Sequence, residues 1–278
     1  MNKVDKLVFK VYGNNPCLSP SRYESFYLLT KLIKEKSWGK VKILEIGCGS
    51  GIYAKLFDNL LDQGQYTGID LEFKGNINQR KEGLKRIKAN FRIMDARKLV
   101  FKNNAFDLVL SFTSLEHIKE DEQVLQQIHR ILAKGGTFFL IIPSIFTFPF
   151  QLGRHGYHYY TKKNLLNKFR KMGFKIEGIY SFGGLAGFFF SLLQNWLDLL
   201  VLLPFGLYYL IFYPQKLKGN SRRDMGGGLA KKILSRTTYV YRKFLIGRKI
   251  HFNLLKLVKL IDDNFPIFPT GYFLVAEK

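Results

Sequence analysis

A glycine-rich turn at residues 47–51 constrains the fold of this chain more than any other feature. The turn reads Gly-Cys-Gly-Ser-Gly, follows the strand-like run 41–46 and precedes residues 52–57, whose apolar side chains have helical spacing. This pattern predicts a buried strand that ends in a tight turn and opens a helix. Glycine lets a backbone approach a ligand closely because it carries no side chain. We therefore expect a nucleotide-like cofactor at this turn.

The spacing of the glycines separates two classes of cofactor. The dinucleotide fingerprint G-x-G-x-x-G requires a third glycine at the position of Ile52, and this departure disfavours a nicotinamide-dependent dehydrogenase. An acidic residue, Glu45, stands two positions before Gly47, which is also unlike that fingerprint. The pattern E-x-G-x-G-x-G from Glu45 to Gly51 resembles motif I of the class I S-adenosylmethionine-dependent methyltransferases, in particular the type 11 family.

Four further segments resemble the same family in the same order. Two strand-like segments end at Asp70 and Asp95, residues 106–111 read as a fourth strand, and residues 130–137 lead into a fifth. The resemblance implies S-adenosylmethionine as cofactor, with Asp70 at the ribose hydroxyls and Asp95 at the adenine amino group. Taken singly, either aspartate could be an ordinary turn residue. The residues that we expect to hold the cofactor are Glu45, Gly47, Gly49, Gly51, Asp70, Leu71, Asp95, Ala96 and Ser111.

Strands and helices alternate along the middle of the chain, which predicts an α/β fold. We expect strands near 41–47, 65–71, 91–95, 106–112, 136–142, 174–182 and 271–278, and helices near 51–61, 76–88, 120–132 and 161–172. In the family the last two strands form an antiparallel hairpin. The resemblance therefore implies a Rossmann-like, seven-stranded, mostly parallel sheet with helices on both faces and an antiparallel last strand.

The same pattern divides the chain into three parts. Residues 1–40 form a helical lead-in, in which Ser21 and Glu24 fit a capping box that opens a helix through about Lys36. Residues 41–182 plus 271–278 form the methyltransferase core. Residues 183–270 form an α-helical insertion between the last two strands, since a connection of this length is too long for a simple loop.

The insertion is first apolar and then basic. Asp198 is its only charged residue between 183 and 215, whereas residues 214–259 contain 13 Lys or Arg and one acidic residue. A single crossing of a bilayer would separate two strands of one sheet, and two crossings need about 40 apolar residues. We therefore expect membrane contact without spanning, against anionic lipids. The alternative is a soluble helical subdomain with an apolar interior or a dimer face.

Composition and cysteine content indicate a location. The chain has a net charge of +23 and 47% hydrophobic residues, enough for a large core. Two cysteines, Cys17 and Cys48, cannot form a disulfide framework, and the N-terminus has no apolar signal core. We expect a cytoplasmic protein, peripheral or monotopic on the inner face of the cell membrane.

Methyl transfer from a sulfonium requires little machinery, because the leaving group is already activated and the enzyme mainly aligns the acceptor. We expect no metal site. A general base is needed only where the acceptor loses a proton. His117, His155 and His158 are candidates to act as that base or to position the acceptor, although each could equally be a structural histidine.

The sequence thus predicts a methyltransferase that acts on a small or lipid-linked acceptor, such as a polyprenyl-linked sugar, a quinone precursor or a lipid, at a membrane surface. The segment around His155 is similar to one in methyltransferases of bacterial surface-polysaccharide and lipid-linked pathways. Two alternatives remain open: an inactive methyltransferase-like membrane scaffold and a nucleic-acid methyltransferase. We do not expect a nucleic-acid partner, because the basic stretch adjoins an apolar one and no Asn-Pro-Pro-Tyr-type motif is present.

Overall fold

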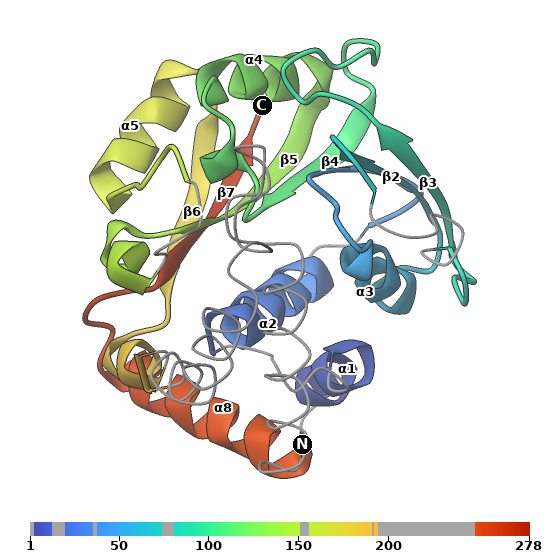
Figure 1. Cartoon of the computed structure of the whole chain (residues 1–278). Helices are drawn as coiled ribbons and strands as arrows, with labels where there is room; N and C mark the ends of the chain where they lie inside the picture. The colour runs from blue at the N-terminus through green and yellow to red at the C-terminus, as the bar shows by residue number, and fades with distance from the viewer. Residues whose placement is uncertain are drawn as a thin grey trace, which may run out of the picture.

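The strands of the computed structural model form one seven-stranded sheet (Figure 1). The model describes residues 3–12, 20–35, 38–73, 81–150, 156–190, 192–193 and 248–278. The strands are β1 (Val41–Ile46), β2 (Gly64–Asp70), β3 (Ile87–Ile93), β4 (Phe106–Phe112), β5 (Leu132–Pro143), β6 (Lys175–Phe182) and β7 (Gly271–Glu277). Their order is β3-β2-β1-β4-β5-β7-β6, and β7 is antiparallel to both neighbours. The predicted Rossmann-like fold is confirmed.

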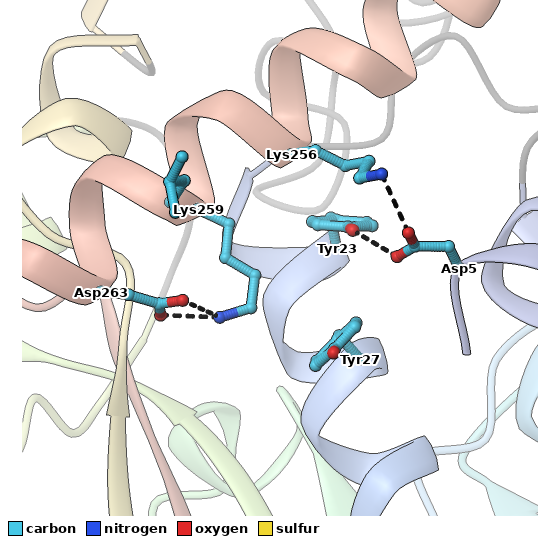
Figure 2. Close-up of a pocket in the computed structure, with 7 residues that line it drawn as sticks. Asp5, Tyr23, Tyr27, Lys256, Lys259 and Asp263 are labelled. Atoms are coloured by element: carbon cyan, nitrogen blue, oxygen red, sulfur yellow. Dashed lines mark hydrogen bonds and ion pairs between the residues drawn. The ribbon is translucent and has the colours of Figure 1, made fainter. Parts of the chain in front are cut away.

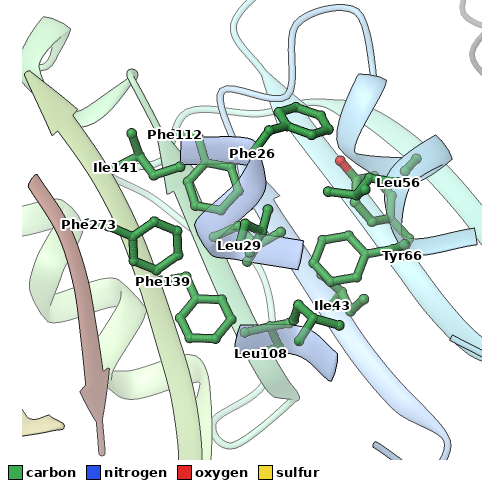
Figure 3. Close-up of a cluster of buried hydrophobic side chains, with 14 of the residues drawn as sticks. Phe26, Leu29, Ile43, Leu56, Tyr66, Leu108, Phe112, Phe139, Ile141 and Phe273 are labelled. Carbon is green, nitrogen blue, oxygen red and sulfur yellow. The ribbon is translucent and has the colours of Figure 1, made fainter. Parts of the chain in front are cut away.

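Helices cover both faces of this sheet. The described helices include α1 (Lys3–Tyr12), α2 (Pro20–Glu35), α3 (Ile52–Leu60), α4 (Asp121–Ile131), α5 (Lys162–Lys171) and α8 (Arg248–Asn264), with short 3-10 helices η2 (Leu115–His117) and η3 (Ile145–Phe150). On one face, α2, α3 and α8 bury apolar side chains such as Phe26 and Leu29 against Ile43 and Phe273 of the sheet (Figure 3). On the other face, α4 and α5 pack against the same strands through a second cluster.

The predicted helix at 76–88 is wrong over its second half. Residues 87–93 form β3, residues 81–86 form a turn and a short loop, and residues 74–80 lie outside the described part of the chain. Asp58 of α3 supplies the reason. Its Oδ1 accepts hydrogen bonds from the backbone amides of Lys85, Arg86 and Ile87, at 2.8, 2.7 and 3.1 Å. These bonds direct the chain into an extended strand beside β2.

The predicted capping box at the start of α2 is also wrong. The helix begins at Pro20, a residue suited to the first helical position, so Ser21 and Glu24 already lie inside it. The Ser21 hydroxyl lies 2.7 Å from the Thr270 hydroxyl, and Glu24 Oε2 accepts a 2.7 Å hydrogen bond from the Gly183 amide. Both partners flank the β6–β7 pair, so α2 is fastened to the edge of the sheet where β5 and β6 end.

The two ends of the 183–270 insertion meet beside that edge. Residues 185–190 are helical, and Asp262 of α8 accepts hydrogen bonds from the amides of Ala186 and Gly187 at 2.8–3.2 Å. A Cβ at Gly187 would lie 2.7 Å from the Asp262 carboxylate, so this approach requires glycine. The apolar stretch beyond residue 193 and the basic stretch up to 247 lie outside the described residues. Among the helices described, none is long and apolar enough to cross a bilayer.

Candidate active site

The turn after β1 is held open by glycine geometry. Gly47, Gly49 and Gly51 have φ angles of +71°, +50° and +73°, in the left-handed region that favours glycine. The Gly47 and Cys48 amides donate to the Ile69 carbonyl at 2.8 and 3.0 Å, which fixes the turn to the end of β2. A Cβ at Gly49 would meet no atom within 4 Å. At Gly49 the turn therefore borders open space, as expected of a turn that a ligand approaches.

Asp70 ties this turn to the end of β2. Its Oδ2 accepts a hydrogen bond from the Gly49 amide at 2.9 Å, and its Oδ1 accepts from the Leu71 amide at 2.8 Å. Each carboxylate oxygen has a second lone pair, so Asp70 can still accept from two ribose hydroxyls. Leu71 follows it with an exposed side chain. The structure brings the two predicted cofactor residues Gly49 and Asp70 into direct contact.

Glu45 is a buried carboxylate in the middle of this arrangement. Its Oε2 is buried, and the described residues give that atom no hydrogen-bond partner. Burial, reinforced by the charge of Asp70, raises the pKa of Glu45 well above its usual range. A cation beside Glu45 would restore its ionised form. S-adenosylmethionine carries two cationic groups, a sulfonium and an ammonium, so this orphaned oxygen fits the cofactor that the motif implies.

The other predicted cofactor residues occupy different settings. The Ser111 hydroxyl is buried without a partner among the described residues, but Ser111 pairs with Ile46 in the β1–β4 register. Because side chains alternate along a strand, Ser111 lies on the opposite face of the sheet from Glu45. Ala96 is buried in the cluster beneath α4 and α5.

Asp95 is bound by an arginine that the sequence analysis did not single out. The Arg97 guanidinium donates to both Asp95 oxygens at 2.7–3.1 Å and to Glu120 at 2.8 Å. This guanidinium lowers the pKa of the Asp95 carboxyl. Asp95 therefore stays ionised, and an adenine amino group would share it with Arg97. The only sequence signal for this pair was the Asp-x-Arg spacing after the third strand.

The three candidate histidines differ in how well they are placed to act as a base. His158 Nε2 lies 3.1 and 3.0 Å from the carbonyl oxygens of Ile118 and Lys119, so it carries the proton of a structural hydrogen bond. This nitrogen is unsuited to act as a base. His117 of η2 is nearly half exposed, with Nε2 3.9 Å from Glu116 Oε1. His155 lies outside the described residues.

Glu116 was not predicted, yet it has the more unusual environment. The side chain is buried, and its Oε2 has no hydrogen-bond partner among the described residues. Burial raises the pKa of Glu116 to about 7. It lies two residues after Ser114, whose hydroxyl donates to the Gly47 carbonyl at 3.4 Å, so it follows β4 close to the glycine turn. The sequence contained no signal of this burial.

Comparison with known proteins agrees with this geometry. Residues 44–140 match the methyltransferase domain family. A phosphatidylethanolamine N-methyltransferase of Cereibacter sphaeroides is 30% identical over 104 residues, 36% of this chain and 49% of that protein. A malonyl-[acyl-carrier protein] O-methyltransferase of Paenibacillus is 29% identical over 143 residues, 48% of this chain and 51% of that protein. The chain thus spans about half the length of these curated relatives.

A solved structure shows the same fold. The phosphoethanolamine N-methyltransferase 2 of Haemonchus contortus, in complex with S-adenosyl-L-methionine, is 19% identical with a TM-score of 0.54, covering 99% of this chain and 56% of that one. At this identity the likeness concerns the fold alone. Residues 44–140 thus match a methyltransferase domain, and the sheet that they build together with β6 and β7 has the fold of the class I S-adenosylmethionine-dependent methyltransferases.

Proposed function

We propose that this protein transfers a methyl group from S-adenosylmethionine to a small or lipid-linked acceptor at a membrane surface. The observation that supports the cofactor is the buried Oε2 of Glu45, which has no hydrogen-bond partner among the described residues, near the open turn at Gly49. When bound there, S-adenosylmethionine supplies a methyl group that is already activated. Glu45 would balance the positive charge, and Asp70 would accept from the ribose hydroxyls.

The chemistry that this chain adds is alignment and, for some acceptors, proton removal. Glu116 and His117 follow β4 at the edge where open α/β sheets bind ligands. Glu116 is suited to take a proton from a hydroxyl or ammonium acceptor, since burial raises its pKa to about 7. His117 is a second candidate, since histidine is a common general base. Asp95 with Arg97 and Glu120 would border the adenine.

The acceptor class is supported by composition and by relatives. Phosphatidylethanolamine, named in one relative, is a membrane lipid, and malonyl-[acyl-carrier protein], named in another, carries an acyl thioester. The net charge of +23 favours an anionic surface. We propose that residues 41–182 with 271–278 act as the core and that residues 183–270 hold it on the inner face of the cell membrane.

Isothermal titration with S-adenosylmethionine tests the cofactor site with a matched pair of variants. Gly49 and Gly83 both have positive φ, +50° and +78°, and in both a Cβ would meet no atom within 4 Å. Gly49→Ala and Gly83→Ala therefore introduce comparable backbone strain. We expect Gly49→Ala to weaken binding by about tenfold or more, the equivalent of about 1.4 kcal/mol, while Gly83→Ala leaves it unchanged.

Binding that is absent in the wild type, or equally affected by the two variants, would refute the proposed site. Activity is measured as the transfer of a radiolabelled methyl group into an organic-solvent extract of bacterial membranes. Cofactor binding without transfer into any fraction would favour the inactive scaffold instead. Transfer into RNA would contradict the proposed acceptor class.

A further inference from the structure

Helix α8 has two apolar sides, which is unusual for a helix at the surface of a protein. Its inner side buries Phe252, Leu255 and Val258 in the core beside α1 and α2. A second set of apolar residues recurs at intervals of four, three and four positions and so lies along one side of the helix. This outer row is 36–62% exposed and consists of Ile250, Leu254, Leu257 and Ile261.

The outer row has a fixed direction because α8 is fastened to the lead-in helices. The Phe252 ring lies 5.2 Å from the Phe9 ring, in an edge-to-face arrangement. Figure 2 shows the polar side of this contact: Lys256 pairs with Asp5 at 3.0 Å, and Lys259 pairs with Asp263 at 2.6 Å. These four side chains line a pocket between α1, α2 and α8, and both of its lysines are neutralised by acids, so the pocket is not an anion site.

The apolar surface continues from α8 into the loop that follows it. Phe265, Ile267 and Phe268 are each 44–57% exposed. Phe268 has a φ of +56°, a strained conformation for a bulky residue, and its ring lies 5.4 Å from that of Phe146. A second ring, that of Phe188, lies 5.9 Å from Phe268. The fold thus holds a partly exposed aromatic cluster at a strained residue, and such strain is common at functional sites.

This loop ends at the same edge of the sheet as the candidate active site. Thr270 donates its amide to the Phe182 carbonyl at 3.0 Å and accepts from the Ser144 amide at 3.1 Å. Phe182 is the last residue of β6, and Ser144 directly follows β5. Helix α8 leads into this loop, which therefore borders the edge at which β5 and β6 end (Figure 1). Because β1 is parallel to β4 and β4 to β5, the glycine turn follows β1 at the same edge.

Charge decides which partner fits this surface. Residues 214–259, which run into α8, contain one acidic residue and 13 Lys or Arg, of which Lys256 and Lys259 are the two paired with Asp5 and Asp263, and the whole chain carries +23. A helix that lies in a membrane interface combines an exposed apolar side with flanking basic residues, and each Lys or Arg near an anionic leaflet strengthens binding. An apolar row of this length on a strongly basic chain matches an anionic bilayer in both respects.

We propose that the outer row of α8 and the loop 265–268 enter the interface of an anionic bilayer and so hold the acceptor edge of the sheet against the lipid. The role of this contact, which is to bring the acceptor edge to the lipid, rests on the proposed function. Vesicle binding itself requires neither cofactor nor catalysis, so the two can fail separately.

The test is flotation of the full chain with vesicles of equal parts phosphatidylglycerol and phosphatidylcholine, and with phosphatidylcholine alone. Leu257→Glu places a charge in the outer row, and Val100→Glu makes the same change at an exposed apolar residue outside it. We expect Leu257→Glu to lower the partition coefficient by about tenfold or more, because the variant no longer transfers a leucine side chain from water into the bilayer. Val100→Glu should change it by less than about threefold.

Phe265→Glu serves as a second variant, with circular dichroism and S-adenosylmethionine affinity as controls on folding for all three. Loss of flotation with unchanged cofactor affinity supports the proposal. Equal flotation of the Leu257 and Val100 variants, or no flotation of the wild type, overturns it and leaves the proposed methyl transfer untouched. A dimer that Leu257→Glu dissociates, without any flotation, also overturns it and makes the outer row a protein interface.

Discussion

Asp58 controls how the chain enters β3, and its removal should have a cost that can be worked out from the structure. One carboxylate oxygen, Oδ1, accepts three consecutive backbone amides, those of Lys85, Arg86 and Ile87. Asp58 itself is buried near the C-terminus of α3. β3 is the edge strand of the sheet and pairs only with β2 among the described strands. These three bonds therefore hold the edge strand β3, and Asp95 follows this strand by two residues.

The three amides differ in what replaces Asp58 when it is removed. Lys85 and Arg86 are exposed, so water can accept from their amides, whereas Ile87 is buried and its amide would be left unpaired. A buried unpaired donor costs about 1–3 kcal/mol, and bonds to a charged group contribute about 1.5–3 kcal/mol. We expect Asp58→Ala to lower the free energy of unfolding by about 2–4 kcal/mol. Asp58→Asn keeps Oδ1 as an acceptor and should cost about 1 kcal/mol.

Urea denaturation of the full chain measures this difference, and hydrogen exchange of residues 87–93 locates it. In the alanine variant, exchange should accelerate in β3 before it does in β1 or β4, and S-adenosylmethionine affinity should fall because Asp95 follows β3. Equal costs for the alanine and asparagine variants would refute the reasoning. So would a cost below about 0.5 kcal/mol for alanine, because the amides would then not depend on Asp58.

Two further predictions concern buried acids. Asp121 accepts hydrogen bonds from the Tyr160 hydroxyl and from Lys168 Nζ. Asp121→Ala should cost about 2–4 kcal/mol, because the Lys168 charge is then left to the Glu122 carboxylate at 3.9 Å, and Tyr160→Phe should cost about 1 kcal/mol, both measured by urea denaturation. Burial raises the pKa of Glu116 from its ordinary 4.5 to about 7, so the folded state binds more protons than the unfolded state between these values. The stability contributed by this group is therefore present at low pH and is lost as pH rises from about 4.5 through 7, on the order of 3 kcal/mol. Glu116→Gln should remove that part of the fall in melting temperature between pH 5 and 8, and an unchanged slope would contradict the assignment.

The parts of the fold that depend on neighbouring residues could be predicted from the sequence. The turn from Gly47 to Gly51 needs left-handed backbone at three glycines, and that requirement is visible in the residues themselves. The antiparallel direction of the last strand followed from the family resemblance, since periodicity alone does not give the direction of a strand. Asp70 was identified by its spacing from the turn, and its contact with the Gly49 amide is consistent with the expected role.

The predictions failed where a residue of a local sequence pattern forms its hydrogen bonds with residues far away in the sequence. Ser21 and Glu24 have the spacing of a capping box, but their partners are Thr270 and Gly183, 249 and 159 residues away. The same holds for the helix expected at 76–88, which Asp58 redirects. The burial of a single acidic residue cannot be predicted from one sequence, so His117 was selected as a candidate base and the adjacent Glu116 was not. The outer row of α8 was counted only as part of a basic stretch.

The carboxylate of Asp262 also gives the molecule a mechanical property. The last pair of the β6–β7 ladder is Phe182 with Gly271, and a pull on the chain at residues 193 and 248 would peel these strands apart from that pair onward. The bonds from Ala186 and Gly187 to Asp262 join the two arms ahead of this pair. They must rupture before any tension reaches the sheet. The sheet is thereby shielded from force applied at residues 193 and 248.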